Sequence, residues 1–110
     1  MINRSLIVFF LAAMLSTAAP ALTDRAHLEK WCTHSSQVAA GRCIGYLLAA
    51  EDALSTQSIE GVRACLPRDV TLQQQHQTVI DWLEAHPDSE GTTALGLVAR
   101  AYAERFPCNK

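Results

Sequence analysis

Four cysteines constrain how a chain of this size can fold. Cys32, Cys43, Cys65 and Cys108 all follow an apolar N-terminal segment in a sequence of 110 residues. A domain of this length buries only about 60 to 65% of the surface that its unfolded chain exposes, so its stability is low without cross-links. An even number of cysteines downstream of an export signal therefore predicts two disulfides and no free thiol.

The N-terminal segment has the features of a signal peptide. Arg4 supplies its only charge, an uninterrupted apolar run extends from Leu6 to Leu15, and Ala19-Pro20-Ala21 offers small residues at the −3 and −1 positions of a cleavage site. A membrane anchor is the alternative, but a bilayer span needs about 20 apolar residues. We predict a signal peptide over residues 1–21, cleaved after about Ala21, and a periplasmic domain over residues 22–110 that has no membrane contact after cleavage.

The charge of this domain excludes one class of partner. Loss of Arg4 leaves eight basic residues against eleven acidic ones, a net charge of −3 with neutral histidines. Nucleic-acid binding calls for a basic face, so we expect no nucleic-acid partner.

The cysteines and histidines do not form a catalytic or metal-binding pattern. There is no Cys-x-x-Cys, no Cys-x-x-x-Cys, and no pair of histidines three or four residues apart. A nucleophilic cysteine with a histidine base is conceivable, but no elbow of small residues surrounds any cysteine, and oxidation would consume the thiol. We predict that the protein is not an enzyme, with no catalytic residue, cofactor or metal.

The domain is expected to be all-α, a small four-helix domain stapled by two disulfides. Alternating β-branched runs are absent, and apolar residues recur at spacings of three and four. The first helix is predicted over about 24–35, with Asp24 as N-cap. The second is predicted over about 39–54, and Gly45 within it suggests that another backbone approaches closely. Residues 55–69 are predicted to form an irregular connector.

The third and fourth helices have the clearest boundaries. Thr71 as N-cap and Gln74 three residues later form a capping box, and Pro87 ends this helix just past His86. The fourth helix is expected to begin at Thr92 or Thr93 and to stop before Pro107. A connecting loop of about five residues predicts antiparallel neighbours.

Helix order also suggests how the cysteines pair. If the last two helices are antiparallel, the end of the fourth lies beside the start of the third, which favours Cys65–Cys108. Cys32 and Cys43 lie on either side of the predicted turn near residues 36–38 and could close the first hairpin. The other two connectivities remain open, because sequence alone cannot exclude them.

Five short phrases follow one another along the chain: Cys43-Ile44-Gly45-Tyr46, Asp52-Ala53, Cys65-Leu66-Pro67 with Val70-Thr71, Trp82-Leu83-Glu84-Ala85-His86-Pro87, and Phe106-Pro107-Cys108. Taken in order, they resemble the Rap1a/Tai4 family of type VI secretion immunity proteins over about residues 28–108. The resemblance implies an exported, all-helical inhibitor that binds a periplasmic peptidoglycan amidase effector, blocks its active site, and often forms a homodimer. The chain departs from the usual pattern of this family at two places. It has Ala49 where relatives usually carry a second glycine, and it has Ser89-Glu90-Gly91 where relatives usually include an apolar residue.

An inhibitor of this kind needs a rigid scaffold with an outward contact surface. The helical pattern leaves the following polar or aromatic residues outward: Gln73, Gln77, Asp81, Trp82, Glu84, Asp88 and Glu90. Trp82 is the strongest candidate for a residue that contacts the partner, because a partly exposed tryptophan is a common interface anchor. The alternatives are that Trp82 only flanks the core and that the acidic residues only form a solvated face.

Two other functions are compatible with the same sequence. An acid-activated periplasmic chaperone would expand at low pH, where protonated carboxylates leave eight basic residues and four histidines, a charge near +12. The two disulfides argue against easy opening. The third possibility is a structural envelope protein without a soluble partner.

Overall fold

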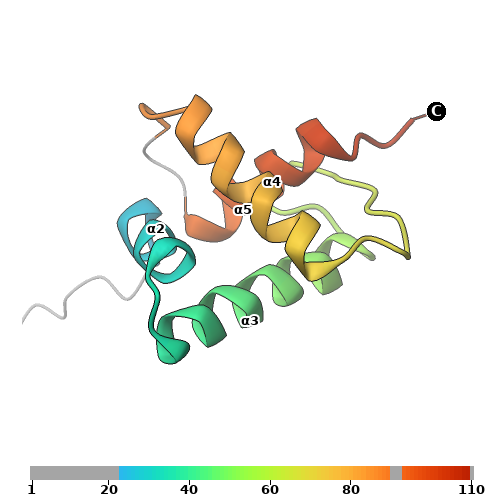
Figure 1. Cartoon of the computed structure of the whole chain (residues 1–110). Coiled ribbons are helices and arrows are strands. Elements are labelled where there is room, and N and C mark those ends of the chain that lie inside the picture. Colours follow the sequence, from blue (N-terminus) through green and yellow to red (C-terminus); the bar gives the residue numbers. More distant parts are fainter. Residues whose placement is uncertain (1–22, 90–92, 110) are drawn as a thin grey trace, which may run out of the picture.

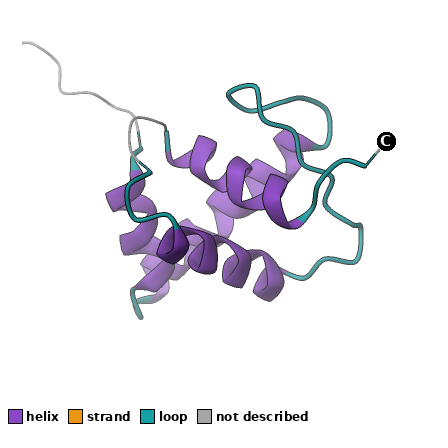
Figure 2. Ribbon diagram, turned by 90° about the horizontal axis from the view of Figure 1, so that it is seen from above, coloured by secondary structure: helices purple, strands orange, loops and turns teal. Residues whose placement is uncertain are grey.

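The computed structural model describes residues 23–89 and 93–109, in which four helices pack around one core (Figures 1 and 2). The helices are α2 (Arg25–Thr33), α3 (Gln37–Leu54), α4 (Leu72–Ala85) and α5 (Ala94–Arg105). The prediction of an all-α domain with four helices is therefore confirmed. The predicted signal peptide lies outside the described residues.

Each helix begins at a side chain that accepts a hydrogen bond from a backbone N–H of its first turn. The capping box of α4 is present as predicted, with Thr71 and Gln74 bonded to each other's backbone N–H. The other caps are Asp24 for α2, Ser36 for α3 and Thr93 for α5. Helix α3 begins two residues earlier than expected because the Ser36 hydroxyl, within the predicted turn, caps it.

Both predicted disulfides are confirmed. Cys32–Cys43 joins α2 to α3 with a Cα–Cα distance of 5.0 Å, and Cys65–Cys108 joins the connector before α4 to the segment after α5 at 4.9 Å. The first bridge is reinforced by His76 of α4, whose Nε2 donates a hydrogen bond of 2.7 Å to the carbonyl oxygen of Cys32. Three helices thus meet at the end of α2.

In the part of the chain that the structure describes, the core is apolar except for one hydrogen-bonded chain of polar groups. Gln75 of α4 is only 1% exposed. Its Nε2 donates to Oε2 of Glu51 at 2.8 Å, and its Oε1 accepts from the hydroxyl of Tyr102 at 2.8 Å. Because buried polar groups are costly without partners, this chain of hydrogen bonds fixes the positions of α3, α4 and α5 relative to one another.

Because the Tyr102 hydroxyl is buried, the stability of the fold should fall as the pH rises into the alkaline range. Burial, and secondarily the charge of Glu51, raises the pKa of Tyr102 above its ordinary value of 10.0. A raised folded-state pKa stabilises the fold at pH values below about 10, and this contribution is lost as the pH rises through the folded-state pKa.

Tyr102→Phe should therefore lower the free energy of unfolding at pH 7 by about 1 to 3 kcal/mol, because Gln75 loses a buried partner. It should also reduce the fall in stability above pH 10. Urea denaturation at pH 7, 9 and 10.5 measures both effects. Tyr46→Phe is the comparison variant: burial also raises the pKa of the half-buried Tyr46, so this replacement should reduce the alkaline loss by less than Tyr102→Phe does. Equal alkaline losses in the wild type and Tyr102→Phe would contradict the prediction.

The connector between α3 and α4 is more ordered than expected. Ile59 and Val62 exchange two backbone hydrogen bonds of 2.9 Å around a tight turn in which Glu60 and Gly61 both have positive φ, 50° and 75°. Ile59 is buried in the core, which anchors the turn. This order makes the connector part of the rigid scaffold.

The predicted close approach at Gly45 is wrong. Gly45 lies on an open face of α3, where an added Cβ would meet no atom within 4 Å. A close contact of another kind occurs at Gly96 of α5, where an added Cβ would overlap the side-chain carboxylate of Glu60. That carboxylate accepts hydrogen bonds of 3.3 Å from the backbone N–H and the hydroxyl of Thr93, so it sits at the start of α5.

Helices α4 and α5 cross instead of lying antiparallel along their length (Figure 1). Near its end, α5 contacts both the first turn of α4, through Tyr102 and Gln75, and the third, through Glu104 and Trp82. The end of α5 nevertheless reaches the connector, where the backbone N–H of Cys65 donates to the carbonyl of Phe106 at 2.8 Å. The pairing Cys65–Cys108 therefore forms although the helices cross.

Candidate functional site

A surface groove of about 740 Å³ is bounded by the connector, α4 and the end of α5. Pro67, Asp69 and Val70 form the connector side. The other lining residues are Gln74, Gln77, Thr78, Asp81, Trp82, Ala85 and His86 of α4, and Ala101, Glu104, Arg105 and Phe106 at the end of α5. The groove therefore depends on the crossing of α4 with α5.

Trp82, His86 and Glu104 form a connected cluster on one side of this groove. The indole Nε1 of Trp82 donates to Oε2 of Glu104 at 2.8 Å. The His86 ring stacks on the indole, with centroids 4.1 Å apart and planes 15° from parallel. Its Nδ1 donates to the carbonyl of Trp82 at 2.8 Å, and its Nε2 lies 3.8 Å from Oε2 of Glu104. Two hydrogen bonds and the ring stacking thus fix the Trp82 and His86 rings at the edge of the groove.

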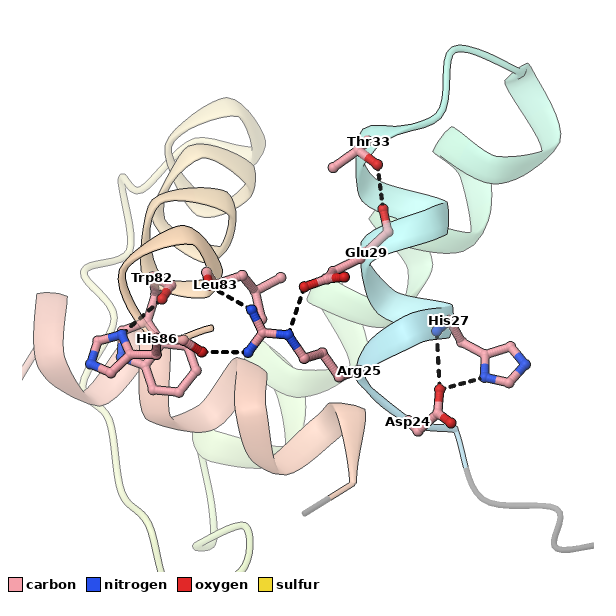
Figure 3. Close-up of polar contacts among 8 residues, drawn as sticks. All are labelled: Asp24, Arg25, His27, Glu29, Thr33, Trp82, Leu83 and His86. Carbon is pink, nitrogen blue, oxygen red and sulfur yellow. Dashed lines mark hydrogen bonds and ion pairs between the residues drawn. The ribbon is translucent and has the colours of Figure 1, made fainter. Parts of the chain in front are cut away.

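Arg25 of α2 stabilises this cluster from the other side (Figure 3). Its guanidinium donates to the carbonyl oxygens of Leu83 and His86 at 2.6 and 2.5 Å, and Nε bonds Glu29 at 2.6 Å. A cation that satisfies the last carbonyls of a helix stabilises its C-terminus. Sequence analysis missed Arg25 because its partners lie about 60 residues away along the chain, and no local pattern signals such a contact.

The groove brings together three of the predicted contact residues. Gln77 and Asp81 line it side by side, with Nε2 of Gln77 donating to Oδ1 of Asp81 at 2.7 Å. Trp82 also lines the groove, but it is only 8% exposed and belongs to the hydrophobic core. The expectation that Trp82 points outward is wrong, because Glu104 and the stacked His86 cover it.

The remaining predicted contact residues lie away from the groove. Gln73, Glu84 and Asp88 are exposed and do not line it. Glu90 lies outside the described residues. Sequence analysis also missed Glu104 and Arg105 of α5, which reach the groove only because α5 crosses α4.

The charges along the groove are unequal. Asp69, Asp81 and Glu104 carry three negative charges, and Arg105 carries one positive charge. The Arg105 guanidinium lies 5.0 Å from the centre of the Phe106 ring, a cation–π geometry. The groove therefore has a net negative charge.

Two further features of the described residues bear on function. No three histidine, cysteine, aspartate or glutamate side chains among residues 23–89 and 93–109 are grouped in a way that could hold a metal ion. Within the same ranges, no helix is both long and apolar enough to span a membrane.

Comparison with known proteins gives one match. The family model described as Rap1a immunity proteins matches residues 24–108, which include all four helices, both disulfides and the whole groove. Searches of curated proteins and of solved structures found no match. The resemblance stated from the five sequence phrases is therefore confirmed, and the chain belongs to the Rap1a immunity protein family.

Proposed function

We propose that this immunity protein acts in the periplasm, where it binds and inhibits a peptidoglycan amidase effector of type VI secretion. The observation that carries the proposal is the family match over residues 24–108. Two features support the compartment. The N-terminal segment has the pattern of a signal peptide, and the two disulfides suit an oxidising environment.

An inhibitor of this kind requires a rigid binding surface but no catalytic groups of its own. A preorganised surface binds more tightly because less conformational entropy is lost on association. The polar chain through Gln75 and the guanidinium of Arg25 hold α4 in place, and the two disulfides cross-link the segments around it. We therefore propose that the outward side of α4, together with the groove and the turn that follows α4, covers the amidase active site.

We also propose that the protein forms a homodimer, as the family resemblance implies. The open face of α3 offers a surface for a second copy. Of the four large exposed apolar side chains among residues 23–89 and 93–109, it carries Val38, Ile44 and Leu48, which are 67%, 42% and 40% exposed. Between them, Gly41 and Gly45 leave room for another backbone.

The test is a titration of the purified mature domain with the product of a neighbouring amidase gene. We expect a tight complex and complete loss of peptidoglycan hydrolysis at equimolar inhibitor, measured by calorimetry and by release of soluble fragments. Sedimentation of the free domain and of the complex gives the stoichiometry. No binding to the amidase, combined with protection of client proteins only below about pH 3, would instead support the acid-activated chaperone.

A further inference from the structure

We propose that the groove between the connector, α4 and α5 receives a basic segment of the effector and binds an arginine or lysine side chain. This inference rests on the proposed function and names the chemistry of the partner. The groove volume, about 740 Å³, falls within the range of about 300 to 1,000 Å³ typical of binding sites. Its apolar lining suits the aliphatic stem of such a side chain, and its carboxylates suit the cationic end.

The carboxylates on α4 and α5 are already oriented for a ligand. Oδ1 of Asp81 accepts from Gln77, and Oε2 of Glu104 accepts from the Trp82 indole. Among the described residues, no donor bonds Oδ2 of Asp81 or Oε1 of Glu104. These free oxygens can accept the N–H groups of a guanidinium or ammonium, in hydrogen bonds strengthened by charge.

The groove's own cation does not neutralise these charges. Arg105 lies over the Phe106 ring, and none of the ion pairs among the described residues involves it. Three carboxylates against one guanidinium leave two uncompensated negative charges along the groove. A basic segment complements this field, which also speeds association at low salt.

The connector side of the groove is held in place before any partner arrives. The Cys65–Cys108 disulfide and the hydrogen bond from Cys65 to Phe106 tie the connector to the end of α5. Asp69 and the apolar residues beside it follow directly after this anchor. A groove with fixed sides binds a segment with a smaller entropic cost.

The first experiment measures effector binding by charge-neutralised variants. Asp81→Asn combined with Glu104→Gln should raise the Kd about 10-fold or more and reduce its salt dependence. Asp52→Asn is the matched control, because Asp52 is an exposed carboxylate of α3 that lies outside the groove and outside the proposed contact side of α4. We expect a change below about twofold for this control. Glutamine at position 104 can still accept from the Trp82 indole, and circular dichroism verifies the fold of each variant.

The second experiment needs no effector. We expect the peptide acetyl-Ala-Arg-Ala-amide to shift the NMR signal of the Trp82 indole N–H, and the same peptide with citrulline in place of arginine to leave it unchanged. The shift should disappear in Glu104→Gln. If the wild type binds the arginine peptide but not the amidase, the groove proposal stands and the proposed function fails. Equal shifts from the two peptides, or an unchanged Kd of the double variant for the amidase, would overturn the groove proposal alone.

Discussion

Replacing Trp82 with alanine should lower the free energy of unfolding by about 3 to 5 kcal/mol, the usual cost of removing a large aromatic side chain from a core. Trp82 is 8% exposed, stacks on His86, and donates its indole N–H to Glu104. The substitution therefore leaves a cavity, an unstacked imidazole and a carboxylate without its donor. Urea denaturation followed by circular dichroism measures the loss.

The variant Trp82→Phe separates the packing of the Trp82 ring from its hydrogen bond to Glu104. Trp82→Phe keeps an aromatic ring but removes the indole N–H, so it should cost about 1 to 2 kcal/mol. Trp31→Ala is the matched control, because Trp31 is only partly buried and should lose less than Trp82→Ala. A loss below about 1 kcal/mol for Trp82→Ala would show that Trp82 is not part of the core and would restore the expectation of an outward anchor.

The double variant Cys65→Ala/Cys108→Ala should lose about 4 kcal/mol of stability, because the disulfide closes a loop with a sequence separation of 43. The Cys32–Cys43 disulfide closes a loop with a sequence separation of only 11. The variant Cys32→Ala/Cys43→Ala should therefore lose about 3 kcal/mol of stability in the same chain-entropy description. Thermal and urea denaturation of both variants at pH 7 compare these losses directly.

Loss of the Cys65–Cys108 disulfide should also weaken binding at the groove. Without Cys65–Cys108 the connector is no longer tied to the end of α5, so binding to the amidase should weaken more than in Cys32→Ala/Cys43→Ala. Binding is compared at a temperature where both variants remain folded. Equal stability losses in the two variants, or a larger loss in Cys32→Ala/Cys43→Ala, would contradict the account based on loop length.

Sequence alone determined the features that depend on near neighbours in the chain. The capping box of Thr71 and Gln74 joins residues three apart, so its chemistry is visible without tertiary structure. The spacing of apolar residues gave the four helices. A short turn between two helices favoured the pairing Cys32–Cys43, whose cysteines are only 11 residues apart, but it did not exclude the other connectivities.

The tertiary structure decided which side chains meet across helices. A helical pattern places Trp82 beside the apolar stripe of α4, but whether it is covered depends on the direction of α5, which brings Glu104 onto its indole. The crossing of α4 and α5 depends on how buried side chains such as Gln75 and Tyr102 fit together. Contacts such as Arg25 with the end of α4 form only after that packing is set, because they join residues about 60 positions apart. Local pattern therefore specified the helices and their caps, while packing specified the groove.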